Sequence, residues 1–280
     1  MRILLFGGSG MVGRELSRAL AAHTVIAPLH TCVDITDVTA VEKIIADEKP
    51  DFIINAAAII NMNTIEQNPA LGRRVNVQGA TAIARAAAAR AIPQLFVSSS
   101  YVFGDSAKPY AEDAMKNPEN EYGKTKAEAE DAVTTCGSDA QWYIVRSSWF
   151  YSAYRDTFVD EVAQSLLQGK PFEASEQRGV PTYGGEFAAA IVKDFIDSSP
   201  QNGVYHIVNE GGASRYKIAR EIARALGAPE SLVVAKGFHS SAMRPSVILK
   251  NTKLPKLPPW DKSLRAYISV KYGQSEGPSV

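Results

Sequence analysis

The chain has 280 residues, and its 30 Lys and Arg balance its 30 Asp and Glu, so the formal net charge is zero. This balance argues against binding to nucleic acid or to an anionic membrane, and leaves a small molecule as the expected partner. Cys32 and Cys136 lie far apart with no histidine at ligand spacing, which excludes an obvious metal site or disulfide framework and favours a reducing, cytoplasmic setting.

An apolar run at residues 2–6 is typical of a central parallel strand, and we expect no cleavable signal segment before it. Glycines follow at Gly7, Gly10 and Gly13, and helical spacing begins directly after them. This order predicts a dinucleotide-binding turn, in which Gly7 permits the tight bend, Gly10 lets the backbone approach a pyrophosphate and Gly13 lets the helix pack on the sheet. We expect any side chain at Gly10 to obstruct binding.

Strands and helices then alternate along the chain. Strands are expected at 24–27, 51–55, 94–98 and 142–146, with helices at about 37–48, 79–91 and 122–136. The alternation predicts an α/β fold with a Rossmann-type, doubly wound parallel sheet, which binds ligands at the carboxyl ends of its strands. No apolar run reaches the roughly 18–20 residues of a membrane span.

The alternation of strands and helices becomes less regular after Arg146. Helices are expected at about 184–196 and 216–226 and a strand at 204–208, whereas the proline-rich tail from Pro245 onward is expected to be irregular. We therefore expect two units. A dinucleotide-binding domain would comprise residues 1–148 with about 183–210, and a smaller, mixed substrate lobe would comprise about 149–182 and 211–280.

Three residues at the expected sheet edge carry the predicted chemistry. Ser99 directly follows a buried strand, and Tyr122 and Lys126, four residues apart, share one helix face. We expect the ammonium of Lys126 to lower the pKa of the Tyr122 phenol, and Ser99 to hydrogen-bond the same substrate oxygen. Such a set predicts ketone reduction, because the phenol can protonate a carbonyl oxygen while a nicotinamide delivers hydride to its carbon.

A second Tyr-x-x-x-Lys pair stands at Tyr267 and Lys271, near the C-terminus. No buried strand ending in serine precedes it at the required distance. We interpret this second pair as structural.

The chain resembles the extended short-chain dehydrogenase/reductase superfamily over most of its length. A narrower set of motifs is similar to those of the dTDP-4-dehydrorhamnose reductases. These motifs are the Asn-Ala-Ala-Ala at 55–58, the Ser99 segment with residues 101–103, the Arg-Ser-Ser-Trp-Phe-Tyr at 146–151, the Gly-Val-Pro-Thr at 179–182, and Arg244 with Pro245. The resemblance implies NAD(P)H-dependent reduction of the 4-keto group of a nucleotide-linked 6-deoxysugar, by a monomer or a homodimer.

The resemblance also implies roles for individual residues. Ser99, Tyr122 and Lys126 would be catalytic, and Lys126 would also bind the nicotinamide ribose. Trp149 would face the sugar ring, unless it is an aromatic core residue, with Ser100 and Arg244 as further substrate contacts. The implied cofactor-binding residues are Gly7, Gly10, Met11, Val12 and Gly13 near the pyrophosphate, Asp34 and Ile35 at the adenine, and Ala56, Ala57 and Ala58 on the ribose side.

Two departures from the family pattern concern the substrate. Residues 59–66 read Ile-Ile-Asn-Met-Asn-Thr-Ile-Glu where the family usually has His-Thr-x-Val-Asp-x-Ala-Glu, and Ser100 replaces a common aspartate. The sugar and its nucleotide therefore stay open. Because residues 27–30 contain no carboxylate to repel a 2′-phosphate, NADPH is favoured over NADH, with Arg14 or His30 as candidate phosphate contacts.

Three other functional classes can be compared with the same residues. A 4,6-dehydratase needs Asp-Glu after the catalytic serine, and Ser100 and Tyr101 do not supply that pair. A nucleotide-sugar epimerase shares the Ser, Tyr and Lys set but is commonly longer. A non-catalytic, cofactor-binding regulatory subunit of the same fold is the third alternative.

Overall fold

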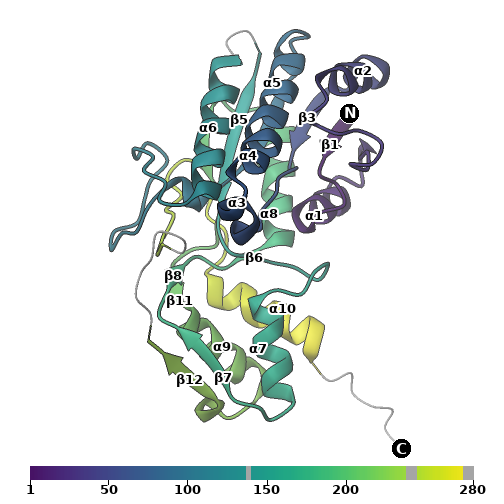
Figure 1. Cartoon of the computed structure of the whole chain (residues 1–280). Coiled ribbons are helices and arrows are strands. Elements are labelled where there is room, and N and C mark those ends of the chain that lie inside the picture. Colours follow the sequence, from purple (N-terminus) through teal and green to yellow (C-terminus); the bar gives the residue numbers. More distant parts are fainter. Residues whose placement is uncertain (137–139, 238–244, 274–280) are drawn as a thin grey trace, which may run out of the picture.

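The computed structural model describes residues 1–136, 140–237 and 245–273. It consists of a large α/β body, which carries the N-terminus, and a smaller body below it that contains α7, α9 and α10 (Figure 1). No helix within the described ranges is both long and apolar enough to cross a bilayer.

The large body is built on one six-stranded sheet in which every neighbouring pair is parallel. The strand order is β10-β5-β4-β3-β1-β2. The strands are β1 (Arg2–Phe6), β2 (Thr24–Ile26), β3 (Phe52–Asn55), β4 (Gln94–Ser99), β5 (Trp142–Ser147) and β10 (Gly203–His206). The Rossmann-type sheet expected from the alternating pattern is confirmed. The strand order reverses beside β1, because β2 and β3 lie on opposite sides of it.

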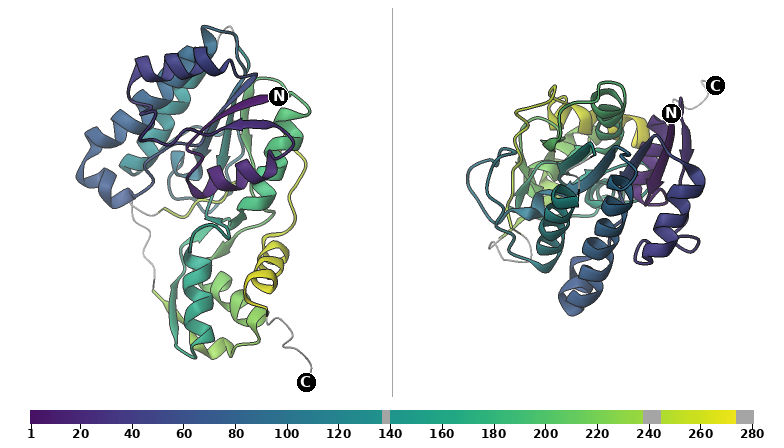
Figure 2. Two further views of the ribbon diagram at one scale, coloured as in Figure 1. Left: turned by 90° about the vertical axis from the view of Figure 1, so that its right-hand side faces the viewer. Right: turned by 90° about the horizontal axis from the view of Figure 1, so that it is seen from above.

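Helices cover both faces of this sheet (Figure 2). One face packs against α1 (Met11–Ala19) and α8 (Gly184–Ile191), which continues as the π-helix η3 (Val192–Ile196). The other face packs against α2 (Val38–Glu48), α5 (Ala80–Ala88) and α6 (Glu121–Cys136). Alternation along β1 produces the two cores, since Ile3 and Leu5 point to one face while Leu4 and Phe6 point to the other.

Short helical segments connect β3 to α5 and β4 to α6. The connections contain α3 (Met62–Gln67), α4 (Pro69–Gly72), the π-helix η1 (Arg73–Gly79) and the 3-10 turn η2 (Ser100–Val102). Asn61, within the stretch that departs from the family pattern, caps α3 by accepting the Thr64 N–H at 3.1 Å. The altered stretch therefore forms a capped helix, since an Asn oxygen satisfies an otherwise free N–H.

The smaller body encloses a separate apolar core between helices and short strand pairs. Its helices are α7 (Phe158–Leu167), α9 (Arg215–Leu226), η4 (Glu230–Leu232) and α10 (Trp260–Tyr272). The strand pairs are β7 (Phe172–Ser175) with β12 (Val233–Lys236), β8 (Arg178–Gly179) with β11 (Ala213–Ser214), and β6 (Phe150–Tyr151) with β9 (Thr182–Tyr183). The chain passes repeatedly between the two bodies, as the colours in Figures 1 and 2 show.

The expectation of an irregular tail is wrong for residues 260–272, which form α10. Proline is tolerated immediately before a helix, and Pro259 occupies the position before the first helical residue. Trp260, Leu264 and Ile268 are buried at helical spacing. The prolines therefore mark the start of a helix, and the apolar spacing after them is the signal for it.

Candidate active site

Loops that follow β1, β2 and β3 form a groove of about 420 Å³ where the strand order reverses. The residues that line it include Gly7, Gly10, Pro28, His30, Asp34, Ile35, Ala56, Ala57, Ala58 and Ile59. Carboxyl ends of parallel strands at such a reversal are where α/β sheets bind ligands. The groove therefore brings together seven of the residues expected at a dinucleotide.

The glycine turn leaves no room for side chains where it meets the neighbouring loop. Gly7 has a φ of +82°, and a Cβ on it would lie 2.6 Å from the Ala57 backbone nitrogen. A Cβ on Gly13 would overlap the Gly7 carbonyl oxygen. Gly10 precedes α1, whose first turn has no side-chain cap, so its free N–H groups fit a phosphate group.

Further residues expected at the cofactor lie in the groove or next to its glycine turn. Met11 and Val12 begin α1, and Val12 packs into the core beneath the turn. Arg14 is exposed and donates from Nε to the Ser9 carbonyl oxygen at 3.2 Å, whereas His30 lines the groove. Hydrogen bonds from Thr36 hold the pKa of Asp34 below its usual value, with Arg74 and His30 adding to this effect.

Ser99 and Tyr122 meet at the carboxyl end of β4. Ser99 ends the strand and accepts the Tyr101 N–H at 3.2 Å, and its hydroxyl lies close enough to the Tyr122 phenol to influence the pKa of that group. The half-buried Tyr122 ring stands edge-on to Tyr101, with 6.1 Å between ring centroids. Lys126 is buried one turn further along α6, donates to the Val97 carbonyl oxygen at 2.7 Å and lies 3.9 Å from the centroid of the Phe96 ring.

The expectation that Lys126 lowers the pKa of Tyr122 is not met in this structure. Burial raises the pKa of Tyr122 to about 12, although the nearby Ser99 hydroxyl opposes this rise. Burial also lowers the pKa of Lys126 to about 7, while the Glu130 carboxylate acts in the opposite direction. For both the Tyr122 phenolate and the Lys126 ammonium, the loss of hydration on burial outweighs the stabilisation by neighbouring groups. Tyr122 is therefore a neutral phenol at neutral pH.

Three residues that the sequence reasoning missed fix the start of α6. Glu66 accepts the Glu121 N–H at 2.7 Å, and Asn120 accepts the Gly123 N–H at 2.7 Å. Asn76, which is 1% exposed, accepts the Ile59 N–H at 2.8 Å and donates to the Thr125 hydroxyl at 3.1 Å. Asn120 is a local helix cap, for which an asparagine before a helix is a sequence signal. No pattern reveals Glu66 and Asn76, because their partners on α6 lie about 50 residues away.

The remaining residues predicted to contact the substrate do not lie together in one site. Trp149 lies just after β5 with a φ of +36°, which is strained for a bulky residue, and the Arg215 guanidinium lies 4.4 Å from a ring centroid of its indole. Trp149 and Arg215 line a cavity of about 110 Å³. Ser100 is 2% exposed and hydrogen-bonds Ser148 at 3.3 Å, so it does not face the groove. Arg244 lies outside the described residues.

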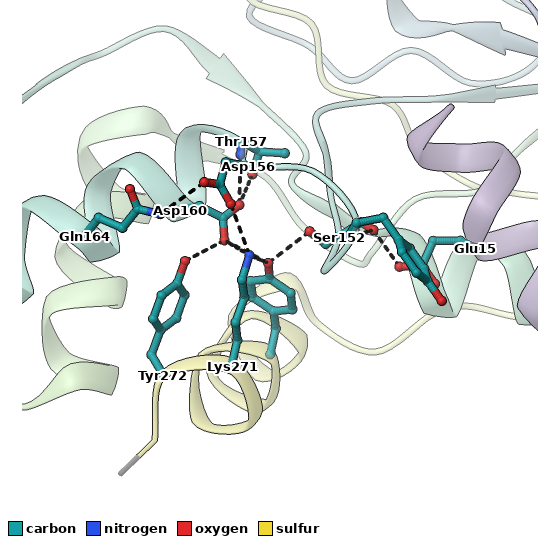
Figure 3. A network of polar contacts seen from close by, with 10 residues as sticks. Glu15, Ser152, Asp156, Thr157, Asp160, Gln164, Lys271 and Tyr272 are labelled. Atoms are coloured by element: carbon teal, nitrogen blue, oxygen red, sulfur yellow. Dashed lines mark hydrogen bonds and ion pairs between the residues drawn. The ribbon is translucent and has the colours of Figure 1, made fainter. Parts of the chain in front are cut away.

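The second Tyr-x-x-x-Lys pair belongs to a buried polar cluster in the smaller body (Figure 3). Lys271 donates to Asp160 at 2.7 Å, and the Tyr267 and Tyr272 hydroxyls each donate to the same carboxylate oxygen at 2.8 Å. The Ser152 carbonyl oxygen, 3.0 Å from the Tyr267 hydroxyl oxygen, is a second acceptor for the same proton, and the Ser152 hydroxyl donates to Glu15 of α1 at 2.7 Å. The pair ties α10 to α7, as expected for a structural role.

Comparisons with known proteins extend over both bodies. The family model described as RmlD substrate binding domain matches residues 1–272. A dTDP-4-dehydrorhamnose reductase of Mycolicibacterium smegmatis is 33% identical, covering 99% of this chain and 88% of the relative. A Streptomyces antibioticus protein named as a probable dTDP-4,6-dihydroxy-2-methyloxan-3-one 4-ketoreductase is 31% identical, covering 95% and 94%. The structure of a Bacillus anthracis dTDP-4-dehydrorhamnose reductase with NADP superposes with a TM-score of 0.87 at 25% identity, covering 96% and 99%.

The groove, the residues at the end of β4 and these matches define an NAD(P)-dependent oxidoreductase of the extended short-chain dehydrogenase/reductase class. The match includes the smaller body as well as the Rossmann sheet. This chain belongs to the RmlD substrate binding domain family, together with dTDP-4-dehydrorhamnose reductases. The family resemblance expected from its motifs is confirmed.

Proposed function

We propose that this protein reduces the 4-keto group of a dTDP-linked 6-deoxyhexose with NADPH, and that Tyr122 donates the proton to the carbonyl oxygen. The arrangement of Ser99 and Tyr122 together at the carboxyl end of β4 carries this proposal. It holds two polar groups where both can reach one substrate oxygen. Relatives that are reductases of dTDP-linked ketosugars support the choice of substrate class.

The protonation states of the site suit a reduction. With a pKa raised to about 12, Tyr122 carries its proton at neutral pH and can give it to the substrate oxygen. The phenolate left behind gains a hydrogen bond from Ser99 and the positive charge of Lys126, whose pKa of about 7 leaves part of it protonated at neutral pH. A bound nicotinamide supplies the hydride.

NADPH is the proposed cofactor on the evidence of the groove. Pro28 and His30 line it after β2, and the carboxylate of Asp34 is already engaged by the Thr36 N–H at 2.9 Å. A 2′-phosphate would therefore meet a histidine rather than a free carboxylate. The two dissociation constants, measured by fluorescence titration, should favour NADPH, and tenfold tighter NADH binding contradicts this choice.

The substrate lobe is proposed to comprise residues 149–182 and 211–280, with the dinucleotide-binding domain formed by 1–148 and about 183–210. Trp149, with Arg215 against its indole face, would contact the sugar ring at the edge of this lobe. Arg244 is retained as a proposed phosphate contact. Ser100 is buried against the equally buried Ser148, so it is proposed to support the substrate site rather than to contact the sugar.

The decisive experiment follows NADPH absorbance with a dTDP-4-keto-6-deoxyhexose as substrate. Replacing Tyr122→Phe should lower the rate by roughly 100-fold or more and leave NADPH affinity nearly intact, because only the proton donor is lost. Tyr267→Phe is the matched control, since it removes the hydroxyl of the second Tyr-x-x-x-Lys pair, and its rate should stay near that of the parent protein.

Each competing function gives a different result in this assay. An epimerase would interconvert nucleotide sugars with no net loss of NADPH absorbance, and a non-catalytic subunit would bind NADPH and turn over no ketosugar. Equal turnover by the parent protein and Tyr122→Phe would exclude Tyr122 as the proton donor.

A further inference from the structure

A buried ion pair lies directly behind the proposed catalytic residues. Glu130 follows Lys126 by four residues on α6, so Tyr122, Lys126 and Glu130 lie along one face of this helix. Glu130 is 2% exposed and forms a bidentate pair with Arg146 of β5, with N to O distances of 2.8 and 2.7 Å. Its first carboxylate oxygen also accepts the Ser98 hydroxyl at 2.6 Å.

The register of β4 sets the spacing between Glu130 and Lys126. Lys126 lies over the ring of Phe96, and Glu130 is bonded to Ser98, the next residue on the same face of the strand. Same-face residues of a strand are about 7 Å apart. The carboxylate and the ammonium are therefore held over neighbouring positions of a buried sheet, where water screens their attraction little.

The other charged groups near this pair come from several elements. Lys116, which precedes α6, lies 3.7 Å from Glu130, and Arg146 belongs to β5. Burial lowers the pKa of His206, on β10, to about 4, although the Glu112 carboxylate opposes this, so His206 is neutral at neutral pH. Glu112 itself accepts the Thr252 N–H and hydroxyl.

We propose that Glu130 is a positioning residue of the reaction, because its carboxylate, fixed by Ser98 and Arg146, holds α6 against β4 and presents a fixed negative charge to the Lys126 ammonium. Its part in the reaction rests on the proposed function of Tyr122 and Lys126. The electrostatic contact itself is a property of the cofactor-free protein and can be measured without turnover.

The test replaces Glu130→Gln, which keeps the shape and removes the charge. The titration of Lys126 is followed by NMR of the lysine side-chain nitrogens in the cofactor-free protein, and the Lys126 signal is identified by its loss in Lys126→Met. In Glu130→Gln, Lys126 should titrate at least about half a pH unit lower than in the parent protein. Glu128→Gln is the matched control. Glu128 lies two residues earlier, pairs with Arg73 and should leave the Lys126 titration unchanged.

Because Glu130→Gln leaves Arg146 buried without its partner, the variant could fail to fold. The double variant Glu130→Gln with Arg146→Met removes both charges and should also titrate below the parent protein, since Lys126 loses the carboxylate it faces. A Lys126 titration at or above that of the parent protein in whichever of the two variants folds overturns the proposal.

Measurements of enzyme activity in the same variant distinguish this proposal from the proposed function. In Glu130→Gln, the loss of kcat/KM toward alkaline pH should move to lower pH by the same shift, whereas a purely structural role would scale the rate equally at all pH values. A shifted titration in a protein that oxidises no NADPH rejects the proposed function alone. An unshifted titration in an active reductase rejects the role of Glu130 alone.

Discussion

Lys126 shows how the proposed chemistry and stability oppose each other at a single residue. Its side chain is buried on α6, with one hydrogen bond to the Val97 carbonyl oxygen and the Phe96 ring beneath it. Burial lowers its pKa from the usual value to about 7. A lysine whose pKa is lowered on folding destabilises the folded state whenever it is charged, so the proposed role of this position comes at a cost in stability.

Replacing Lys126→Met should therefore stabilise the cofactor-free protein by about 1–3 kcal/mol at pH 6. Between pH 7 and about 10.5 only the unfolded chain binds the proton, so the stability of the parent protein rises with pH and the advantage of the variant fades. Urea unfolding at pH 6 and pH 9 measures both effects. Lys124→Met, which removes an exposed lysine paired with Glu121, should change stability by less than about 0.5 kcal/mol.

A loss of stability in Lys126→Met, or a gain that grows with pH, would contradict this account of the buried ammonium.

At the residue scale, the sequence predicted the groups whose spacing is local. Tyr122 and Lys126 share a helix face because they are four residues apart, and Ser99 was found because a buried strand ends there. Glu130 and Asn76 were missed because their partners, Arg146 and Thr125, come from other elements. The raised pKa of Tyr122 was missed for a related reason, since burial depends on the packed structure and not on spacing.

Among the elements, the glycine turn before α1 is expected to contain one glycine needed for folding and another needed for the proposed cofactor binding. A Cβ on Gly13 would overlap the Gly7 carbonyl oxygen, whereas a Cβ on Gly10 would meet that oxygen at 3.3 Å. Gly13→Ala gains about 1 kcal/mol of helix propensity but must displace backbone atoms. Gly10→Ala needs only a small adjustment, at the point where the pyrophosphate would lie.

We expect Gly13→Ala to lose about 1–3 kcal/mol of stability in urea unfolding. Gly10→Ala should remain within about 1 kcal/mol of the parent protein and should bind NADPH at least about tenfold more weakly in a fluorescence titration. The reverse pattern, with a destabilised Gly10→Ala and a fully stable Gly13→Ala, would show that the turn does not divide these roles.

The elements that the sequence predicted are those with a strong local period. The sheet strands lie close to their expected positions, with 94–98 observed as β4 (Gln94–Ser99). The two-residue strands β6, β8, β9 and β11 carry no period, because pairing with distant segments defines them. The π-helix η3 lies inside the helix expected at about 184–196, since the apolar spacing does not reveal a local change in hydrogen bonding.

For the whole molecule, the cluster around Asp160 joins segments more than 100 residues apart. Burial alone would raise the pKa of Asp160, but hydrogen bonds from Lys271, Tyr272, Thr157 and Tyr267 outweigh it and hold the pKa below its usual value. The resulting stability is present above the ordinary carboxyl pKa and is lost as the pH falls through the lowered one. The contact between α7 and α10 should therefore weaken only in acid.

Asp160→Asn should lower the free energy of unfolding by about 2–4 kcal/mol at neutral pH, because it leaves Lys271 without its buried counter-charge. Asp156→Asn is the matched control. Asp156 is 64% exposed and lies 3.4 Å from the same ammonium, so its loss should cost less than about 1 kcal/mol. Urea unfolding at pH 7 compares the stabilities of the two variants. Equal losses of stability would mean that the burial of Asp160 adds nothing to the strength of its ion pair.

The place of β10 at the edge of the large sheet affects how the chain is made. Its partner β5 ends at residue 147, yet residues 203–206 are synthesised only after α7, β7 and α8. Until then the hydrogen-bonding groups along one side of β5 have no strand to pair with, and such open edges recruit other chains. A translational pause before residue 203 should therefore be a period in which nascent chains aggregate or depend on chaperones.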